Sequence, residues 1–188
     1  MPEPFLEELN RGSEADPAAA RKEYVQWQRG PLTRTPMPLM KSWIDLAAGR
    51  DNIWLVLVFH GVDGIGWEPK TSGELREYFG YIKSKQGRLW VATFQDVTKY
   101  MRERAHGAVE IRRKGATIEV SLRHDLSQDL YDLPLTLKTR VPARWPAVRV
   151  SQGTSTQRAD IERDGEQAWA TYPAVPNAGT VTLAEAGP

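Results

Sequence analysis

The chain has 188 residues, with 25 Lys or Arg against 24 Asp or Glu, so its formal net charge is +1. This balance argues against sequence-independent binding of nucleic acid, which needs a basic surface. The absence of cysteine excludes disulfides, thiolate metal sites and a cysteine nucleophile. No apolar run approaches the roughly 20 residues of a membrane span and no export signal is visible, so we expect a soluble chain without nucleic-acid or membrane partners.

The first part of the chain predicts helices that alternate with loops and a strand. A helix is expected over residues 18–28, and the three prolines within residues 31–38 then favour a loop. A short helix over residues 40–48 leads into the apolar run 53–59. Seven consecutive apolar residues predict a strand buried on both faces, which is typical of a parallel sheet covered by helices.

A second strand and two further helices are expected before residue 106. Ser72 is a candidate N-cap for an amphipathic helix whose apolar stripe consists of Leu75, Tyr78, Phe79 and Ile82. A second buried strand is predicted over residues 89–94, followed by a helix over residues 97–104. This order of strand and helix predicts a piece of a parallel sheet or barrel, which we assign to residues 1–106.

Beyond residue 106 the hydrophobic period changes to two, which indicates strands. Two alternating runs flank Lys114-Gly115 and predict a β-hairpin. Further short alternating runs continue to the end of the chain, with Gly, Pro and Asn between them. Residues 107–188 are therefore predicted to form an antiparallel β-sandwich. The expected fold class is α/β plus all-β, an incomplete β/α barrel segment followed by this sandwich.

His60 is the candidate catalytic residue with the most informative position. It follows the predicted strand 53–59 and precedes a glycine-rich loop. In parallel sheets and barrels, the carboxyl ends of strands are where ligands and catalytic groups collect. An imidazole there can act as a general acid or base or can bind a metal. The alternative is a structural histidine that bonds a loop carbonyl, and the sequence leaves both interpretations open.

Carboxylates near His60 supply candidate partners and metal ligands. Asp63 and Glu68 lie in the loop after it and could bind a hard cation, for which Ca²⁺ is favoured over Zn²⁺. Solvated loop carboxylates are the alternative interpretation. Asp96 or Asp45 could pair with His60, while Asp96 could equally cap the helix that follows it. No nucleotide-binding or other organic cofactor motif is present, so no organic cofactor is expected.

Tryptophans are abundant, with seven in the chain. Trp54 and Trp90 lie in predicted strands and are interpreted as core residues. Trp67 lies in the loop after the first strand, where its ring could stack on a sugar or form the wall of an acyl pocket. We assign Trp67 to substrate binding, together with Gly61 and Gly64 of the same loop.

The stretch from KSWIDLAAGRDNIWLVLVFHGVDGIGW to WVATFQDVTKYMRER resembles the carboxyl-terminal half of the polysaccharide deacetylases, the NodB-like carbohydrate esterases. Family members end the barrel with a strand of the form Leu-x-Leu-x-His, to which residues 55–60 are close. The resemblance implies that His60 is the catalytic acid, that Asp45 assists it, and that a β-sandwich follows the barrel. Members are often extracellular or periplasmic. The family's Asp-Asp base motif, His-x-x-x-His metal pair and Arg-x-Pro-Tyr segment do not occur before residue 37.

Two hypotheses of function follow. The first is a small hydrolase of acyl bonds (ester, lactone, N-acetyl or O-acetyl) in which His60 and a carboxylate activate water, with a divalent cation as an optional aid. The alternative is a non-catalytic module that dimerises, or that binds polysaccharide through Trp67, Trp145 or Trp169. The expected partners are a small acyl substrate or a polysaccharide. We also expect a homo-oligomer, because an incomplete barrel leaves strand edges uncovered.

Overall fold

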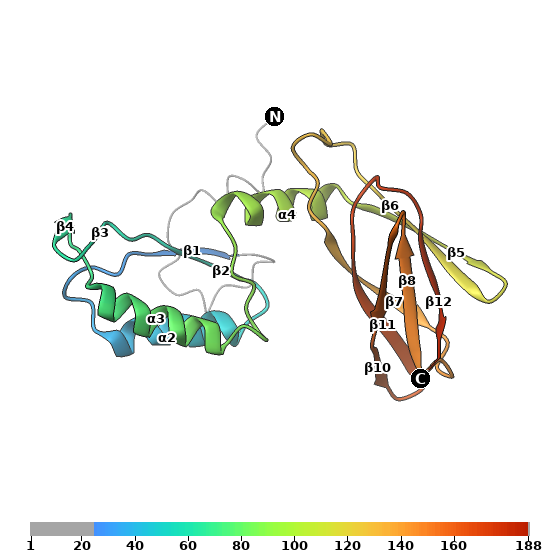
Figure 1. The fold of residues 1–188 in the computed structure, drawn as a ribbon, viewed down its shortest axis with the longest axis horizontal. Helices are drawn as coiled ribbons and strands as arrows, with labels where there is room; N and C mark the ends of the chain where they lie inside the picture. Colours follow the sequence, from blue (N-terminus) through green and yellow to red (C-terminus); the bar gives the residue numbers. More distant parts are fainter. Residues whose placement is uncertain (1–24, 188) are drawn as a thin grey trace. The chain divides into compact units, whose positions relative to one another are not determined.

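The computed structural model describes residues 25–187, which divide into two compact units between Val91 and Ala92 (Figure 1). We call residues 25–91 the N-terminal unit and residues 92–187 the two-sheet unit. Together they contain helices, one parallel strand pair and several antiparallel pairs. Among these residues, no helix combines the length and the apolar character needed to cross a membrane.

The N-terminal unit has a parallel strand pair packed against two helices. Strands β1 and β2 run in the same direction, with Trp27 opposite Leu55. One hydrophobic cluster joins the strands and helices, and its buried members are Trp27, Met40, Trp43, Ile44 and Tyr78. The elements of this unit are β1 (Val25–Arg29), α2 (Met37–Ala48), β2 (Ile53–Leu57), β3 (Gly61–Val62), β4 (Ile65–Gly66) and α3 (Ser72–Ser84).

Two predicted elements of this unit are wrong. A helix is expected over residues 18–28, but residues 25–29 form strand β1 and pair with β2. Residues 18–24 of the expected helix lie outside the described part of the chain. The strand expected over residues 89–94 is absent: residues 89–93 are irregular, and their apolar side chains Trp90 and Val91 are 57% and 69% exposed. The described residues therefore contain no closed barrel, and the incomplete barrel remains a prediction.

The two-sheet unit consists of two antiparallel sheets with a common core. The predicted hairpin is confirmed as β5 and β6, and its turn contains Gly115 at a φ of +59°. One sheet has five strands in the order β5 (Ala108–Lys114), β6 (Thr117–Arg123), β12 (Val181–Ala186), β8 (Ala147–Gln152) and β9 (Ser155–Ala159). The other has three in the order β10 (Ile161–Asp164), β11 (Gln167–Ala174) and β7 (Leu135–Val141).

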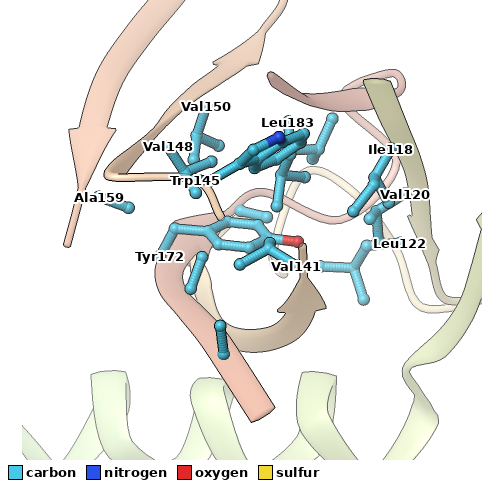
Figure 2. Packing of buried hydrophobic residues seen from close by; sticks show 14 of the residues in the cluster. Ile118, Val120, Leu122, Val141, Trp145, Val148, Val150, Ala159, Tyr172 and Leu183 are labelled. Carbon is cyan, nitrogen blue, oxygen red and sulfur yellow. The ribbon is translucent and has the colours of Figure 1, made fainter. Parts of the chain in front are cut away.

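Side chains from both sheets fill the core of this unit (Figure 2). The alternating burial of β6 and β11 places every second residue in this cluster, as a half-buried strand requires. Trp145 is 2% exposed, so its predicted role in polysaccharide binding is wrong. The Tyr172 hydroxyl lies 2.7 Å from Thr139 Oγ1, which satisfies both buried polar groups.

Helix α4 (Phe94–His106) belongs to the two-sheet unit and packs against its strand β7. The Thr136 N–H donates to the Tyr100 hydroxyl at 3.3 Å, and the Leu133 N–H donates to Glu103 Oε1 at 3.1 Å. The compact units consequently divide before α4, whereas the sequence placed a domain boundary near residue 106, after it. Glu103 is fully buried, and its Oε2 lies 3.8 Å from His124 Nε2 without a hydrogen bond.

Glu103→Gln tests the cost of this buried carboxylate. Burial raises the pKa of Glu103, so its charged form is less stable in the folded protein than in the unfolded chain. The amide keeps the acceptor for Leu133 and removes the charge. We expect the variant to unfold at a higher urea concentration at pH 7, and this advantage should shrink as the pH falls through the raised pKa toward the ordinary value of about 4.3.

The control is Glu185→Gln, at an exposed position of β12, which should leave the urea midpoint at pH 7 nearly unchanged. Lower stability of Glu103→Gln at pH 7 would contradict the prediction. It would show that the Glu103 carboxylate gains more from His124 than its burial costs.

Candidate functional site

His60 lies at the carboxyl end of the parallel strand pair, as the sequence predicted. Pairing continues beyond β2, since the Val58 N–H donates to the Arg29 carbonyl at 2.9 Å. His60 is exposed, and a Cβ built on Gly30 would lie 3.8 Å from its Nε2. The imidazole therefore lies beside the chain that leaves β1. The residues of β2 itself are only half-buried, so the prediction of burial on both faces is wrong.

A short hairpin, β3 and β4, follows His60 directly. Gly61 is paired with Gly66, and the two backbones approach so closely that neither position has room for a side chain. A Cβ on Gly61 would collide with the Ile65 carbonyl oxygen, and one on Gly66 with the His60 carbonyl oxygen. Gly64 has a φ of +83° and open space around it. The close approach of the two hairpin backbones is sufficient to explain the glycine at position 61. The substrate roles of Gly61 and Gly64 remain predictions.

The hairpin presents an exposed aromatic ring beside the histidine. The ring centroids of His60 and Trp67 are 4.8 Å apart, and the planes meet edge to face at 80°. Trp67 is 61% exposed. Val62 and Ile65 pair across the hairpin and so share one face of it, at 40% and 79% exposure. We call these four residues the His60–Trp67 surface.

Both predicted metal ligands of the loop bind backbone N–H groups. Asp63 Oδ1 accepts from the Ser72 N–H at 2.7 Å, and Glu68 Oε2 accepts from the Thr33 N–H at 3.1 Å. Both residues have positive φ angles, 51° and 46°, a backbone conformation that is uncommon for residues other than glycine. Within residues 25–187, no group of three or more His, Cys, Asp or Glu residues could hold a metal ion. The cation site at Asp63 and Glu68 remains a prediction.

Lys70 is the central residue of this region, and the sequence reasoning missed it. Its side chain is only 2% exposed. Its Nζ donates to the carbonyls of Thr33 at 3.2 Å and Thr35 at 2.8 Å, and to Glu74 Oε1 at 2.9 Å. Its backbone N–H donates to the Gly61 carbonyl at 3.1 Å. Lys70 therefore joins the proline-rich loop to helix α3 through its ammonium, and both to the hairpin through its backbone.

Glu74 completes this arrangement at the start of α3. The cap of the helix is Thr71 rather than the predicted Ser72, and Glu74 forms a capping box with it. Hydrogen bonds from the Thr71 backbone, from Lys70 and from the Thr71 hydroxyl lower the pKa of Glu74 to about 2. The T-x-x-E pattern in residues 71–74 was the available signal for this cap. No comparable sequence pattern indicated that the Lys70 side chain is buried.

Asp45 does not contact His60. Its Oδ1 accepts from the Tyr81 hydroxyl at 2.6 Å and lies 3.0 Å from Lys85 Nζ, and both interactions lower the pKa of Asp45. These partners lie at the carboxyl end of α3, whereas the hairpin joins the amino end through Asp63 and the Ser72 N–H. The length of the helix, about 1.5 Å per residue, separates the two places.

Asp96 lies in the first turn of α4, in the two-sheet unit. Its N–H donates to Thr93 Oγ1 at 3.1 Å, so Thr93 is the cap and Asp96 is not. Its carboxylate has the favourable position of a negative charge near a helix N-terminus. The pairing of Asp96 with His60 remains a prediction.

The two-sheet unit contains a polar cavity of about 490 Å³, lined in part by Arg123, His124, Asp125 and Asn177. Asn177 has a φ of +58° and holds the chain at His124, accepting from its N–H at 3.2 Å and donating to its carbonyl at 2.9 Å. His106 Nδ1 lies 3.0 Å from Asp125 Oδ1. These contacts hold the loop that follows β6, and they account for the polar side chains there.

The chain matches no family model. It is similar to a gellan lyase from a Bacillus species, with 26% identity over 138 residues. The matched region covers 69% of this chain and 6% of that protein, so the chain spans only a small part of the relative's length.

Lys70→Met tests whether the buried ammonium holds the N-terminal unit together. Methionine fills a similar volume but cannot donate to the two carbonyls and to Glu74, which leaves buried acceptors without partners. We expect the free energy of unfolding of this unit to fall by about 3 kcal/mol, measured by urea unfolding followed through tryptophan fluorescence.

Lys41→Met is the matched control, because Lys41 forms an ion pair of 2.7 Å with Glu77 at the surface. Its loss should cost less than about 1 kcal/mol. Equal losses in the two variants would show that Lys70 contributes no more than a surface lysine.

Proposed function

We propose that the chain is a polysaccharide-contacting module and that the His60–Trp67 surface makes the contact. The observation that carries this proposal is the exposed Trp67 ring, which lies edge to face against His60 beside a hairpin whose two glycines have no room for a side chain. A fixed, exposed indole offers a large apolar face to a sugar ring at little cost in conformational entropy. The name of the similar gellan lyase, a polysaccharide lyase, supports the same class of ligand.

The proposed architecture is that of the carboxyl-terminal part of a NodB-like polysaccharide deacetylase. In this interpretation the N-terminal unit is a segment of a β/α barrel, and the two-sheet unit is the β-sandwich that follows it. The parallel β1–β2 pair with His60 at its carboxyl end supports the first assignment. The shared core of the two antiparallel sheets supports the second.

A second candidate function is hydrolysis of acyl bonds at His60. Its ring is exposed and makes no hydrogen bond or ion pair with another side chain in the described part of the chain, so its nitrogens are open to a substrate or water. In such a reaction His60 takes the proton of a water that attacks the acyl carbonyl carbon. The resulting imidazolium then returns a proton to the leaving oxygen or nitrogen as the acyl bond breaks.

Neither Asp45 nor Asp63, the two carboxylates of the N-terminal unit that could assist His60, is bonded to it. Asp63 binds the α3 backbone and Asp45 binds Tyr81 and Lys85. An unassisted imidazole is a modest general base, so we expect slow turnover of activated acyl esters. A divalent cation held by loop carboxylates would polarise the acyl carbonyl, and it is a part of this proposal that a chelator can test.

Trp67→Ala tests polysaccharide binding. We expect affinity for gellan, measured by affinity electrophoresis, to fall about tenfold or more, because the substitution removes the stacking face. Trp67→Phe should retain part of the affinity. Trp90→Ala is the matched control, since Trp90 is similarly exposed at 57% but lies outside the hairpin. Equal binding by Trp67→Ala and the unsubstituted chain would overturn the assignment of this surface.

His60→Ala tests hydrolysis separately. A panel of acyl esters, lactones and acetylated sugars is assayed with and without a chelator, and near-ultraviolet circular dichroism checks that the fold is retained. Turnover that disappears in His60→Ala and persists in Trp90→Ala is the expected result. Turnover unchanged by His60→Ala would reject His60 as a catalytic residue, and turnover unaffected by the chelator would reject the cation.

A further inference from the structure

Strand β5 is the outermost strand of the five-stranded sheet (Figure 1). It pairs with β6 on one side and with no other strand in the described part of the chain. All seven of its residues are exposed. An exposed edge of this length presents a row of backbone N–H and C=O groups that can pair with another strand.

The inner face of β5 carries two uncovered apolar side chains, Val109 and Ile111, with Arg113 on the same face. Val109 and Ile111 lie opposite Leu122 and Val120, which are buried in the core at 2% and 0% exposure. Paired residues share a face, so Val109 and Ile111 continue the core-facing side of the sheet. They are nevertheless 48% and 55% exposed. The described residues therefore leave the apolar edge of this face uncovered.

The outer face of β5 carries opposite charges two residues apart. Arg112 Nη2 lies 3.5 Å from Glu110 Oε2 on the same strand, so both side chains are on the face opposite Ile111. Two copies of β5 can be placed side by side and related by a two-fold axis normal to the sheet. The two strands are then antiparallel, and the inner face of one continues the inner face of the other. A residue can therefore pair only with a residue on the same face of the other copy.

The permitted registers differ sharply in their charge pairs. When Ile111 lies opposite its counterpart, Glu110 of each copy faces Arg112 of the other, which gives two opposite-charge pairs. A shift of the axis to Glu110 places Glu110 against Glu110 and leaves no opposite-charge pair. A shift to Arg112 places Arg112 against Arg112, although Glu110 of each copy then faces Lys114 of the other. Like charges directly opposite each other destabilise a strand pair, so the Ile111-centred register is the one of these three that has opposite-charge pairs and no like-charge pair.

We propose that β5 pairs antiparallel with the β5 of a second copy of this chain, centred on Ile111. The pairing joins the two five-stranded sheets edge to edge and satisfies the open backbone groups of both. It also places the two Ile111 side chains in contact on the uncovered inner face. The self-complementary charges identify the occupant as a second copy, because a strand of another protein has no reason to carry the same pattern.

The experiment is sedimentation velocity on the full chain over a range of concentrations. The unsubstituted chain should form a dimer. Glu110→Arg alone and Arg112→Glu alone each create two like-charge pairs, so each should raise the dissociation constant about tenfold or more. The double variant Glu110→Arg with Arg112→Glu exchanges the charges and should restore the dimer.

Mixing the two single variants gives the sharpest result. One copy then carries Arg at 110 and 112 and the other Glu at both, so the two should form a heterodimer although neither dimerises alone. Arg158→Glu on β9, at the opposite edge of the same sheet, is the control and should leave the dimer unchanged. A monomer at all concentrations would overturn the proposal. Glu110 and Arg112 would then be interpreted as charges that prevent edge-to-edge pairing of β5. A dimer insensitive to the single reversals, or a mixture that stays monomeric, would also overturn it.

Discussion

The buried ammonium of Lys70 is the interaction on which the arrangement of the N-terminal unit depends. It donates hydrogen bonds to two carbonyls of the proline-rich loop and to the Glu74 carboxylate. Its own backbone bonds to the hairpin that follows His60. A charge this deeply buried is tolerated only with a full set of partners. Because the pKa of Glu74 is lowered to about 2, the Glu74 carboxylate stays ionised over the whole physiological range.

The position of the His60–Trp67 surface follows from this anchor. Lys70 ties the hairpin to the proline-rich loop and to α3, and the absence of side chains at Gly61 and Gly66 lets the two hairpin backbones approach closely. Asp63 and Glu68 adopt positive φ angles, and each offsets that strain by accepting a backbone N–H. The loop carboxylates thus hold the hairpin in place, which leaves His60 and Trp67 as the groups that face outward with side chains suited to a ligand.

What the sequence predicted correctly depended on short-range patterns. The β5–β6 hairpin follows from alternation around Lys114-Gly115, and the place of His60 follows from the apolar run before it. The errors arise where a distant partner decides. Residues 25–29 form a strand only because β2 lies beside them, and residues 89–93 form none because no strand within residues 25–187 pairs with them. Burial of Lys70 depends on carbonyls about 35 positions earlier, which no local pattern reveals.

The two proposals reinforce each other through the polymeric nature of a polysaccharide. A single exposed indole beside a histidine is a small contact area, so one His60–Trp67 surface should bind a sugar chain weakly. A two-fold pair of chains carries two identical surfaces, and a polymer bound at one of them is held at a high effective concentration near the other. Binding of this kind gains strength without any new contact, provided that the polymer can span both surfaces. Pairing through β5 uses no residue of the His60–Trp67 surface, because β5 belongs to the two-sheet unit and that surface to the N-terminal unit.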